Sequence, residues 1–320
     1  MPLCEDRRVK GDELSAVFVA ALQELMNHND RVVCLEADLG GASKTSRIHA
    51  SHPQRYVQCG ISEANMMGVA AGLSATGYIP FAHTFGPFAT RRACDQIFLS
   101  GAYAGNTINI YGSDPGFAAG PNGGTHTTYE DISILRAIPR VTILDAADAV
   151  QLEWIVRAVA DRPGVNYFRA NRKAVRNVYA PGTTFEIGKG VVTREGDDVL
   201  IVTAGQIISD ALDCAEMLAD EGISCEVLDM FTIKPFDSEL LLERAAGKKA
   251  VVSFENHSIY GGLGSAVAET LAESPLNPVF RRHGVNDRFG QVGSQDFLQA
   301  EYGLCAEHLA DTVRQVMSAV

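Results

Sequence analysis

The residue whose position most suggests chemistry is Glu63, at the expected start of an apolar helix. It follows a short apolar run, residues 55–59, that we expect to form a strand. Small apolar residues then recur at helical spacing, at Ala64, Met67, Gly68 and Ala71. Ser62 can cap this helix, and the helix dipole favours a carboxylate in the first turn. Because open α/β sheets bind ligands at the carboxyl ends of their strands, Glu63 is either a capping residue or an acid–base group of a site.

Two further motifs follow Glu63 along the chain. Phe85 and Phe88 stand three residues apart, where an apolar strand, residues 79–84, leads into a helix. A Gly-rich loop, residues 116–126, ends at His126. Two aromatic faces can line a slot for a flat ring, and imidazole suits proton transfer near neutral pH. Core packing of the phenylalanines and a structural role for His126 are the alternatives.

The elements that would position these residues alternate along the chain. In the first half we expect strands at 31–36, 55–59, 79–84, 107–111, 141–145 and 165–169, and helices at 12–27, from Glu63 onward, 88–103, 129–137 and 147–160. In the second half we expect strands at 199–203, 224–229, 249–254 and 278–283, and helices at 209–221, 237–246, 264–272 and 306–320. The alternation predicts an α/β protein of two domains, each a mostly parallel sheet flanked by helices.

A polar stretch without periodicity separates the two series of elements. Residues 171–184 include Pro181-Gly182, and we place a linker there. The expected organisation is an N-terminal tail (1–10), a first domain (11–170), the linker, and a second domain (185–320). A length of 320 residues agrees with two domains.

Composition narrows the class of function. The formal net charge is −12 and no basic tract occurs, which argues against nucleic acid and anionic membranes as partners. The seven cysteines include no Cys-x-x-Cys pair, so we expect free thiols in a reducing cytoplasm. Residues 1–10 lack the apolar core of a signal peptide, and the uncharged run 96–113 is broken by Gly, Asn and Ser, so we expect no membrane span.

The order of these motifs resembles a known family. A Glu, an aromatic pair and a Gly-rich loop ending in His resemble the pyrimidine-binding half of thiamine diphosphate enzymes, most closely the transketolase family, from about Val32 to the C-terminus. The resemblance implies that Glu63 is the central catalytic residue, hydrogen-bonded to the far ring nitrogen of the cofactor's aminopyrimidine. It implies that Phe85 and Phe88 flank that ring and that His126 contacts the oxygens of the substrate.

The resemblance carries over to other positions as well. Asp38 matches an Asp that orders loops near the cofactor, although a turn or helix-cap role would also explain it. Arg169 matches an Arg that binds a sugar phosphate, with an ion pair as the alternative. Asn122 stands where the family has an Asp that reads a donor hydroxyl, and Ser113 stands where it has a substrate-facing His. These two departures leave the specificity for the donor sugar open.

Three more departures concern the margin of the site. His83 has no counterpart in typical transketolases and lies two residues before Phe85, from where it could reach the pocket. Arg91 replaces a third family aromatic. A phosphate-binding Ser of the family aligns with Ala42, next to Ser43, so the resemblance makes a phosphorylated substrate an expectation without securing it.

The second half also resembles the transketolase C-terminal domain. The matching segments are residues 186–190, 232–237, 255–257 and 261–264. In the family this domain builds the dimer and is not catalytic. Glu255 and His257 are therefore expected to be structural.

One half of a thiamine diphosphate site does not occur in the sequence. The family holds the diphosphate through Mg²⁺ with a Gly-Asp-Gly motif, whereas this chain has only Gly11-Asp12-Glu13 and Gly196-Asp197-Asp198 and no other metal cluster. The resemblance therefore implies the C-terminal subunit of a split transketolase, inactive alone. A separate N-terminal subunit would hold Mg²⁺ and the diphosphate, in an expected heterotetramer that moves a two-carbon ketol unit from a ketose to an aldose.

Other interpretations remain open from the sequence. The β subunit of a 2-oxoacid dehydrogenase shares the two-domain plan and the catalytic Glu, but the run Gly123-Gly124-Thr125-His126 and the segment 136–139 favour transketolase. Deoxyxylulose-phosphate synthase is disfavoured because it carries both halves in one chain. A non-catalytic regulatory subunit of the same fold would accommodate Asn122 and Ser113, whereas the presence of Glu63 argues against it.

Overall fold

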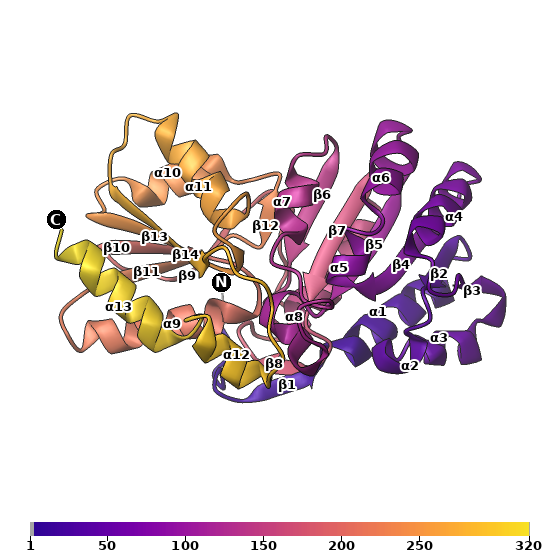
Figure 1. Cartoon of the computed structure of the whole chain (residues 1–320), viewed down its shortest axis with the longest axis horizontal. Coiled ribbons are helices and arrows are strands. Elements are labelled where there is room, and N and C mark those ends of the chain that lie inside the picture. Colours follow the sequence, from indigo (N-terminus) through magenta and orange to yellow (C-terminus); the bar gives the residue numbers. More distant parts are fainter. Residues whose placement is uncertain (1–2, 320) are drawn as a thin grey trace.

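The chain folds into two α/β domains, as the alternation of elements predicts (Figure 1). The computed structural model describes residues 3–319. A seven-stranded sheet has the order β12-β6-β7-β5-β4-β2-β3, and a five-stranded sheet has the order β14-β13-β10-β11-β9. Each sheet is parallel except for one edge strand, β12 in the first and β9 in the second. The predicted fold class is therefore confirmed.

The first sheet carries the residues of the expected site. Its strands are β2 (Val32–Glu36), β3 (Tyr56–Gln58), β4 (Ile79–Phe85), β5 (Ile108–Ser113), β6 (Val141–Asp145), β7 (Val165–Ala170) and β12 (Thr232–Lys234). Helices α1 (Leu14–His28) and α8 (Ala149–Ala160) cover one face, and α4 (Glu63–Ala75), η2 (Ile97–Tyr103) and α7 (Asp131–Arg136) cover the other. The shorter elements are β1 (Lys10–Glu13), α2 (Gly40–Ser43), α3 (Ser46–Ser51), η1 (Pro53–Arg55), α5 (Gly86–Ala89), α6 (Cys94–Gln96), η3 (Gly116–Asn122) and β8 (Ala174–Arg176).

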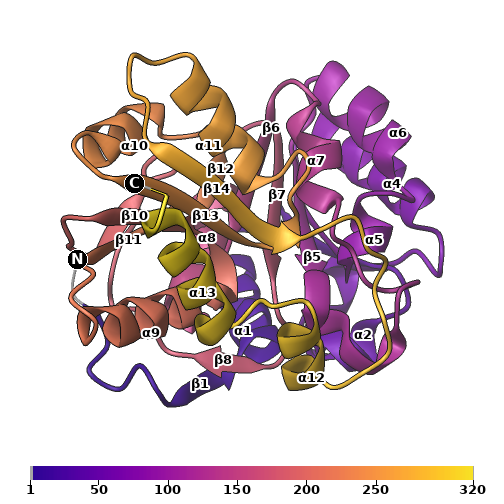
Figure 2. The ribbon, with the colours of Figure 1, turned by 60° about the vertical axis from the view of Figure 1, so that its left-hand side comes forward.

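The second sheet is likewise covered on both faces. Its strands are β9 (Val191–Arg194), β10 (Val199–Thr203), β11 (Cys225–Asp229), β13 (Ala250–Ser258) and β14 (Val279–Val285). Its helices are η4 (Gly205–Ile207), α9 (Ile208–Ala219), α10 (Ser238–Ala245), α11 (Leu263–Ala272), α12 (Gln295–Glu301) and α13 (Ala306–Met317). Figure 2 shows α10 and α11 on one side of this sheet and α9 and α13 on the other.

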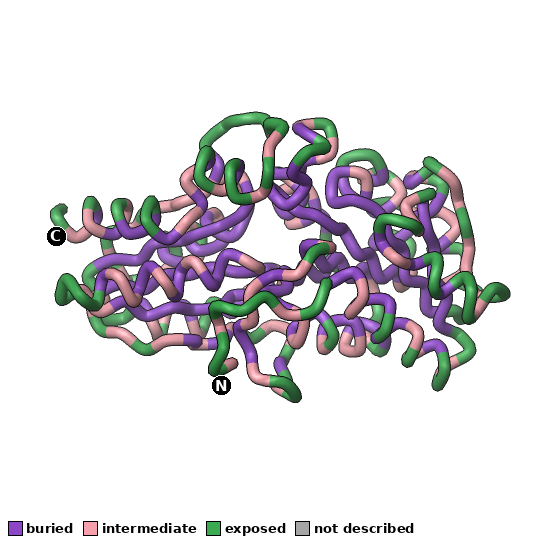
Figure 3. The backbone as a smooth tube through the Cα atoms, turned by 90° about the horizontal axis from the view of Figure 1, so that it is seen from below, coloured by how far each residue is buried: buried purple, intermediate pink, exposed green. Residues whose placement is uncertain are grey.

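Burial follows from this layered arrangement. Every residue of β2, β4 and β5 is buried, because a parallel strand with helices on both faces has no solvent side. Figure 3 shows the buried backbone running through both sheets while the exposed segments lie at the periphery. No helix within residues 3–319 combines the length and apolar character that a membrane span requires. All seven cysteines are free thiols.

The buried stripe of α4 differs from the expected one. Its buried residues are Glu63, Met66, Met67, Ala70 and Ala71, whereas Ala64 and Gly68 are only partly buried. The stripe begins at Glu63 itself and continues at helical spacing. A count of apolar residues alone misses this register, because its first member is a carboxylate.

The predicted helix over residues 88–103 is broken into α5, α6 and the π-helical segment η2. The hydroxyl of Thr90 donates to the carbonyl oxygen of Gly86 at 2.7 Å, and α5 ends there. Hydroxyl bonding to the carbonyl four residues back competes with regular helix continuation. The break places Arg91 and Arg92 in a turn rather than on a continuous helix.

The two halves of the chain also share strands. Strand β12 comes from the second half of the sequence but pairs antiparallel with β6 at the edge of the first sheet. Strand β8 lies inside the segment 171–184, where we expected irregular structure, and pairs with β1. Both pairings join segments far apart in sequence, so local periodicity does not indicate them. The domain boundaries given above stay a prediction.

Candidate active site

Glu63 is a buried carboxylate with a specific cationic partner. It is the first residue of α4 and is 1% exposed, while the side chain of the preceding Ser62 makes no capping hydrogen bond. Arg92 Nη1 lies 2.7 Å from Oε1 and 2.8 Å from Oε2 of Glu63. The Arg92 side chain is 45% exposed, so the pair connects the interior to the surface. Glu63 therefore does more than face the helix dipole.

The aromatic pair and His126 gather beside this ion pair. The guanidinium carbon of Arg92 lies 4.0 Å from the centroid of the Phe88 ring. The ring centroids of Phe85 and Phe88 are 6.1 Å apart. His126 meets both rings edge-on, with centroid distances of 5.1 Å to Phe88 and 6.0 Å to Phe85. Residues from three separate segments thus form one group of a cation, two aromatic faces and an imidazole, which is joined to Glu63 through Arg92.

A second cation lies on the other aromatic ring. Arg172 stands 4.6 Å from the centroid of Phe85 and pairs through Nε with Asp114 at 2.5 Å. Asp114 is buried and directly follows β5. Burial raises the pKa of Asp114, while the charge and hydrogen bonds of Arg172 act in the opposite direction. Arg172 thus extends the group along the carboxyl edge of the sheet.

His83 does not reach toward open space; it bridges two buried side chains. Its Nδ1 lies 3.0 Å from Oε2 of Glu36, and its Nε2 lies 3.0 Å from Oγ of Ser113. All three residues are fully buried at the carboxyl ends of β2, β4 and β5. Burial alone would raise the pKa of Glu36, but the charge and hydrogen bond of His83, with hydroxyl donors from Thr45 and Ser43, hold it below its usual value. The hydroxyl of Ser113 is therefore hydrogen-bonded to the imidazole of His83.

Asp38 and Asn122 are both exposed. Asp38 has a positive φ of 63°, and its backbone N–H donates to Oε1 of Gln58 at 2.9 Å. Asn122 ends η3, in the same loop as His126. Within residues 3–319 neither side chain forms a hydrogen bond or ion pair with Glu63, His126 or the aromatic pair. Their expected contacts with cofactor and substrate stay predictions.

Arg169 is placed differently from the expectation of an accessible phosphate-binding cation. Its side chain is 1% exposed. Its guanidinium bonds Asp131 at 3.0 Å and Asp145 at 2.7 Å, and Nη2 also lies 3.4 Å from the carbonyl oxygen of Asn256 in the second domain. Although Nε of Arg169 has no hydrogen-bond partner among the described residues, a guanidinium that is 1% exposed and paired with two carboxylates offers no solvent-accessible face to a sugar phosphate. In this structure Arg169 is therefore a buried ion-pair residue, which was the alternative to phosphate binding.

Sequence reasoning missed several members of the group. Arg92 was overlooked although it follows Phe88 by four residues, and Arg172 was overlooked in favour of Arg169. A basic residue soon after a strand or aromatic motif is a weak signal, because surface cations are common. The sequence signal for Glu36 is stronger, because a carboxylate at the end of an apolar strand must have hydrogen-bond partners when it is buried.

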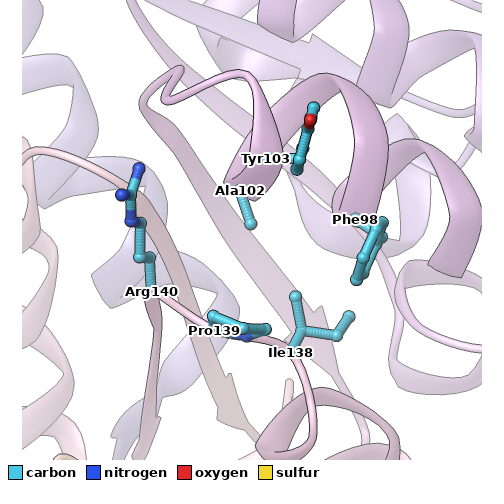
Figure 4. A pocket seen from close by; sticks show the side chains of 6 residues that line it. All are labelled: Phe98, Ala102, Tyr103, Ile138, Pro139 and Arg140. Carbon is cyan, nitrogen blue, oxygen red and sulfur yellow. The ribbon is translucent and has the colours of Figure 1, made fainter.

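Among the pockets of the structure, two lie beside loops of the first domain without being lined by Glu63, Phe85, Phe88 or His126. One, of about 240 Å³, lies between η2 and the turn at 138–140 and includes none of the expected site residues; Figure 4 shows its lining, Phe98, Ala102, Tyr103, Ile138, Pro139 and Arg140. The other, of about 320 Å³, joins Arg91 and the Gly-rich loop to the segment 287–290 of the second domain. In the described part of the chain, no group of three or more His, Cys, Asp or Glu side chains could hold a metal ion.

Two family models match the chain. Residues 13–178 match the transketolase pyrimidine-binding domain, and residues 188–309 match the transketolase C-terminal domain. These matches cover the two domains described above, and the first contains Glu63, the aromatic pair and His126.

Similar proteins match over nearly the full length of the chain. A 6-deoxy-6-sulfo-D-fructose transketolase subunit of Clostridium sp. (strain MSTE9) is 44% identical over 303 residues, which cover 95% of this chain and 94% of that protein. A putative transketolase C-terminal section of Methanocaldococcus jannaschii is 38% identical, covering 92% of this chain and 93% of that one. An apulose-4-phosphate transketolase subunit of Phocaeicola vulgatus is 34% identical, covering 92% and 94%.

Solved structures agree with these matches. A split-gene transketolase, described as an inactive β4 tetramer, superimposes with a TM-score of 0.87 at 40% identity, covering 96% of this chain and 99% of that one. A transketolase of Pichia stipitis shares the fold with a TM-score of 0.81 at 19% identity, and the match covers 47% of that longer chain. The chain belongs to the transketolase family, as the C-terminal section of a split transketolase that carries the pyrimidine-binding and C-terminal domains.

Proposed function

We propose that this chain supplies the pyrimidine-binding half of an active site in a two-chain transketolase. The complete enzyme would move a two-carbon ketol unit from a ketose to an aldose. The observation that carries the proposal is the buried carboxylate of Glu63 paired with Arg92, whose guanidinium lies over the Phe88 ring that His126 also contacts. Membership in the transketolase family supports it.

The residues present fit the aminopyrimidine of thiamine diphosphate. A carboxylate that is 1% exposed can form a strong hydrogen bond to a ring nitrogen, and two phenylalanines offer apolar faces for the ring. When bound, the cofactor supplies the carbanion chemistry that breaks and forms carbon–carbon bonds. Glu63 would hold the proton at the far ring nitrogen, and the pair Phe85 and Phe88 would orient the ring and exclude water. Asp38 would order the adjoining loop.

His126 would face the sugar, whereas the fully buried Ser113 would lie behind the surface of the site. His126 is partly exposed at the edge of the aromatic pair, where an imidazole can donate to a carbonyl or hydroxyl oxygen. Ser113 replaces the second histidine of the family, and His83 with Glu36 orients its hydroxyl. Asn122 would hydrogen-bond a hydroxyl of the donor sugar through its uncharged amide.

We propose an anionic sugar as the substrate class. Two of the similar proteins are named for substrates with a sulfonate or a phosphate group. In this chain Arg172 is the cation next to Phe85 and is 20% exposed, whereas Arg169 is buried. A planar guanidinium suits either oxyanion, so Arg172 takes the role first expected of Arg169.

The remaining half of the site would come from another polypeptide. Two of the similar proteins are named as subunits, and one similar structure is described as an inactive tetramer of β chains. We propose a cytoplasmic heterotetramer in which an N-terminal subunit holds Mg²⁺ and the diphosphate. This chain by itself would then be inactive.

The test is a tagged purification of this chain from its native cells, followed by a ketol-transfer assay with thiamine diphosphate and Mg²⁺. We expect a stoichiometric partner that carries Gly-Asp-Gly, and activity only when both chains are present. An acyltransferase partner would instead support the 2-oxoacid dehydrogenase interpretation. Full activity of the assembled enzyme with Glu63→Ala would support a regulatory subunit.

A further inference from the structure

We propose that the C-terminal domain positions the Gly-rich loop that carries His126, through Asn256 at the start of the loop, Gln295 at its third residue and Gly290 at its far end. The proposal rests on the proposed function, in which this loop meets the substrate. It gives the second domain a role in the active site beyond assembly of subunits.

Asn256 holds the start of the loop. It lies in β13 of the second domain and is 3% exposed. Its Nδ2 donates to the carbonyl oxygen of Pro115 at 3.0 Å, and its Oδ1 accepts from the backbone N–H of Phe117 at 3.2 Å. The side-chain amide thus brackets Gly116, which has a positive φ of 57°. Two hydrogen bonds to backbone groups fix the direction in which the loop leaves β5.

Gln295 holds the same loop two residues further on, at Ala118. It is the first residue of α12, and its Nε2 donates to the carbonyl oxygen of Ala118 at 2.9 Å. Its Oε1 accepts from Nδ2 of Asn171, near the end of β7, at 3.2 Å. One side chain of the second domain thereby ties the loop to the carboxyl edge of the first sheet.

The segment before α12 lies against the far end of the loop. In Figures 1 and 2 the chain leaves β14, runs along the side of the first domain and returns to α12. A Cβ added at Gly124 would lie 2.6 Å from the carbonyl oxygen of Gly290, so the two backbones are in direct contact. A Cβ added at Gly290 would likewise lie 2.6 Å from Cβ of Thr127. This contact flanks His126.

The loop needs such external anchors because its own sequence leaves it free. Gly116, Gly120 and Gly123 all have positive φ, and glycine carries the largest backbone entropy in the unfolded chain. Between Gly123 and Thr127 the internal ties include hydrogen bonds from His126 N, Thr127 N and the Thr127 hydroxyl to the Gly123 carbonyl oxygen, and one between the Thr125 hydroxyl and Nδ1 of His126. Contacts with the second domain therefore add to the ties within the first domain in setting where the His126 imidazole lies against Phe88.

The first experiment compares Gln295→Ala with Gln299→Ala. Both glutamines are on α12, but Gln299 donates to the carbonyl oxygen of Leu304 within its own domain at 2.7 Å. Hydrogen exchange of the purified chain, followed by mass spectrometry, reports protection of residues 116–127 without any need for activity. We expect faster exchange of this segment in Gln295→Ala and wild-type exchange in Gln299→Ala.

The kinetic arm uses the assembled two-chain enzyme. We expect Gln295→Ala to raise KM for the ketose about tenfold, because a loop displaced by roughly 1 Å misaligns His126. The affinity for thiamine diphosphate should stay within twofold or so of wild type, since Glu63, Phe85 and Phe88 lie outside the loop, and a merely structural defect would not spare it. Asn256→Ala and Gly290→Ala should act in the same direction, and they keep the test open if one variant fails to fold.

Two outcomes would overturn the proposal. One is exchange of residues 116–127 that is the same in Gln295→Ala and Gln299→Ala; the other is an unchanged KM in the presence of faster exchange. Failure of the proposed function looks different. In that case His126→Ala would leave ketol transfer intact, while the exchange result would still show that the second domain positions the loop.

Discussion

Arg92 and Glu63 form an ion pair in which one guanidinium nitrogen lies 2.7 and 2.8 Å from the two carboxylate oxygens. The two residues are 29 positions apart, and their pairing joins the start of α4 to the turn after α5. Because the same guanidinium lies 4.0 Å from the centroid of the Phe88 ring, it connects Glu63, the expected acid–base residue, to the aromatic pair.

The first prediction concerns the stability of this pair. Arg92→Gln should lower the free energy of unfolding by about 1–3 kcal/mol, because a buried carboxylate loses its counter-ion; the exposure of Arg92 keeps the loss below that of a fully buried pair. The double variant Glu63→Gln/Arg92→Gln should be more stable than Arg92→Gln alone. Urea denaturation of the wild type, Glu63→Gln, Arg92→Gln and the double variant gives the coupling energy between the two side chains. Additive effects of the two substitutions would show that the contact does not stabilise the chain.

The second prediction concerns catalysis by Glu63. Glu63→Gln keeps the shape of the side chain but cannot exchange a proton with a ring nitrogen, so kcat of the assembled enzyme should fall on the order of 10²–10⁴-fold. The variant should still co-purify with the partner subunit, which separates a chemical defect from an assembly defect. Wild-type kcat in this variant would remove Glu63 from the mechanism.

The third prediction concerns the aromatic pair. Phe88→Leu removes the ring that faces His126 and Arg92, and an aromatic contact contributes about 0.5–1.5 kcal/mol. The Kd of the assembled enzyme for thiamine diphosphate should therefore rise roughly 2- to 10-fold, as measured by calorimetry. Phe280→Leu, at a partly buried phenylalanine of β14 in the second domain, is the matched control and should leave this Kd unchanged. Equal effects of the two substitutions would contradict a pyrimidine-binding role for Phe88.

The fourth prediction concerns pH and Asp229, at the end of β11. Its Oδ2 accepts hydrogen bonds from Gln151 and Tyr179, while Oδ1 has no partner among the described residues. Burial raises the pKa of Asp229 to about 7, with further contributions from the charges of Asp145 and Asp148. The folded chain thus holds this proton more tightly than the unfolded chain does.

The sign of the pH effect follows from that shift. Above the unfolded pKa of about 3.9, the free energy of unfolding should decline as pH rises toward 7, since folding retains a proton that the unfolded state releases. Asp229→Asn should remove this part of the decline and be more stable than wild type at pH 8, on the order of 1–3 kcal/mol. Urea titrations across pH test it. Asp220→Asn, at an exposed position, is the control and should reproduce the wild-type profile.

Much of the fold could be predicted because it depends on local patterns. The strand expected at 141–145 is β6 to the residue, and the expected helix at 147–160 corresponds closely to α8. Apolar runs and helical periodicity reflect burial on one or both faces of a single element. The helix expected over 88–103 was wrong as one unit, because the chain forms α5, a turn, α6 and the π-helical η2 there.

The sequence predicted which residues belong to the candidate site better than it predicted which side chains they contact. The order of Glu63, the aromatic pair and His126 was visible along the chain, and the structure brings the aromatic pair, His126 and the Arg92 partner of Glu63 together. The partners of the charged residues were not visible. Arg169 was expected to be accessible but pairs with Asp131 and Asp145, 38 and 24 residues away.

The sequence by itself determined the alternating elements, the place of Glu63 at a helix start and the family of the chain, because each is written in neighbouring residues. The tertiary structure decided which side chain neutralises each buried charge, as with Arg92 for Glu63 and His83 for Glu36. It also decided that β12 completes the first sheet and that Asn256 fastens the Gly-rich loop. These contacts join residues distant in sequence, and only packing in three dimensions selects among the many partners that the composition allows.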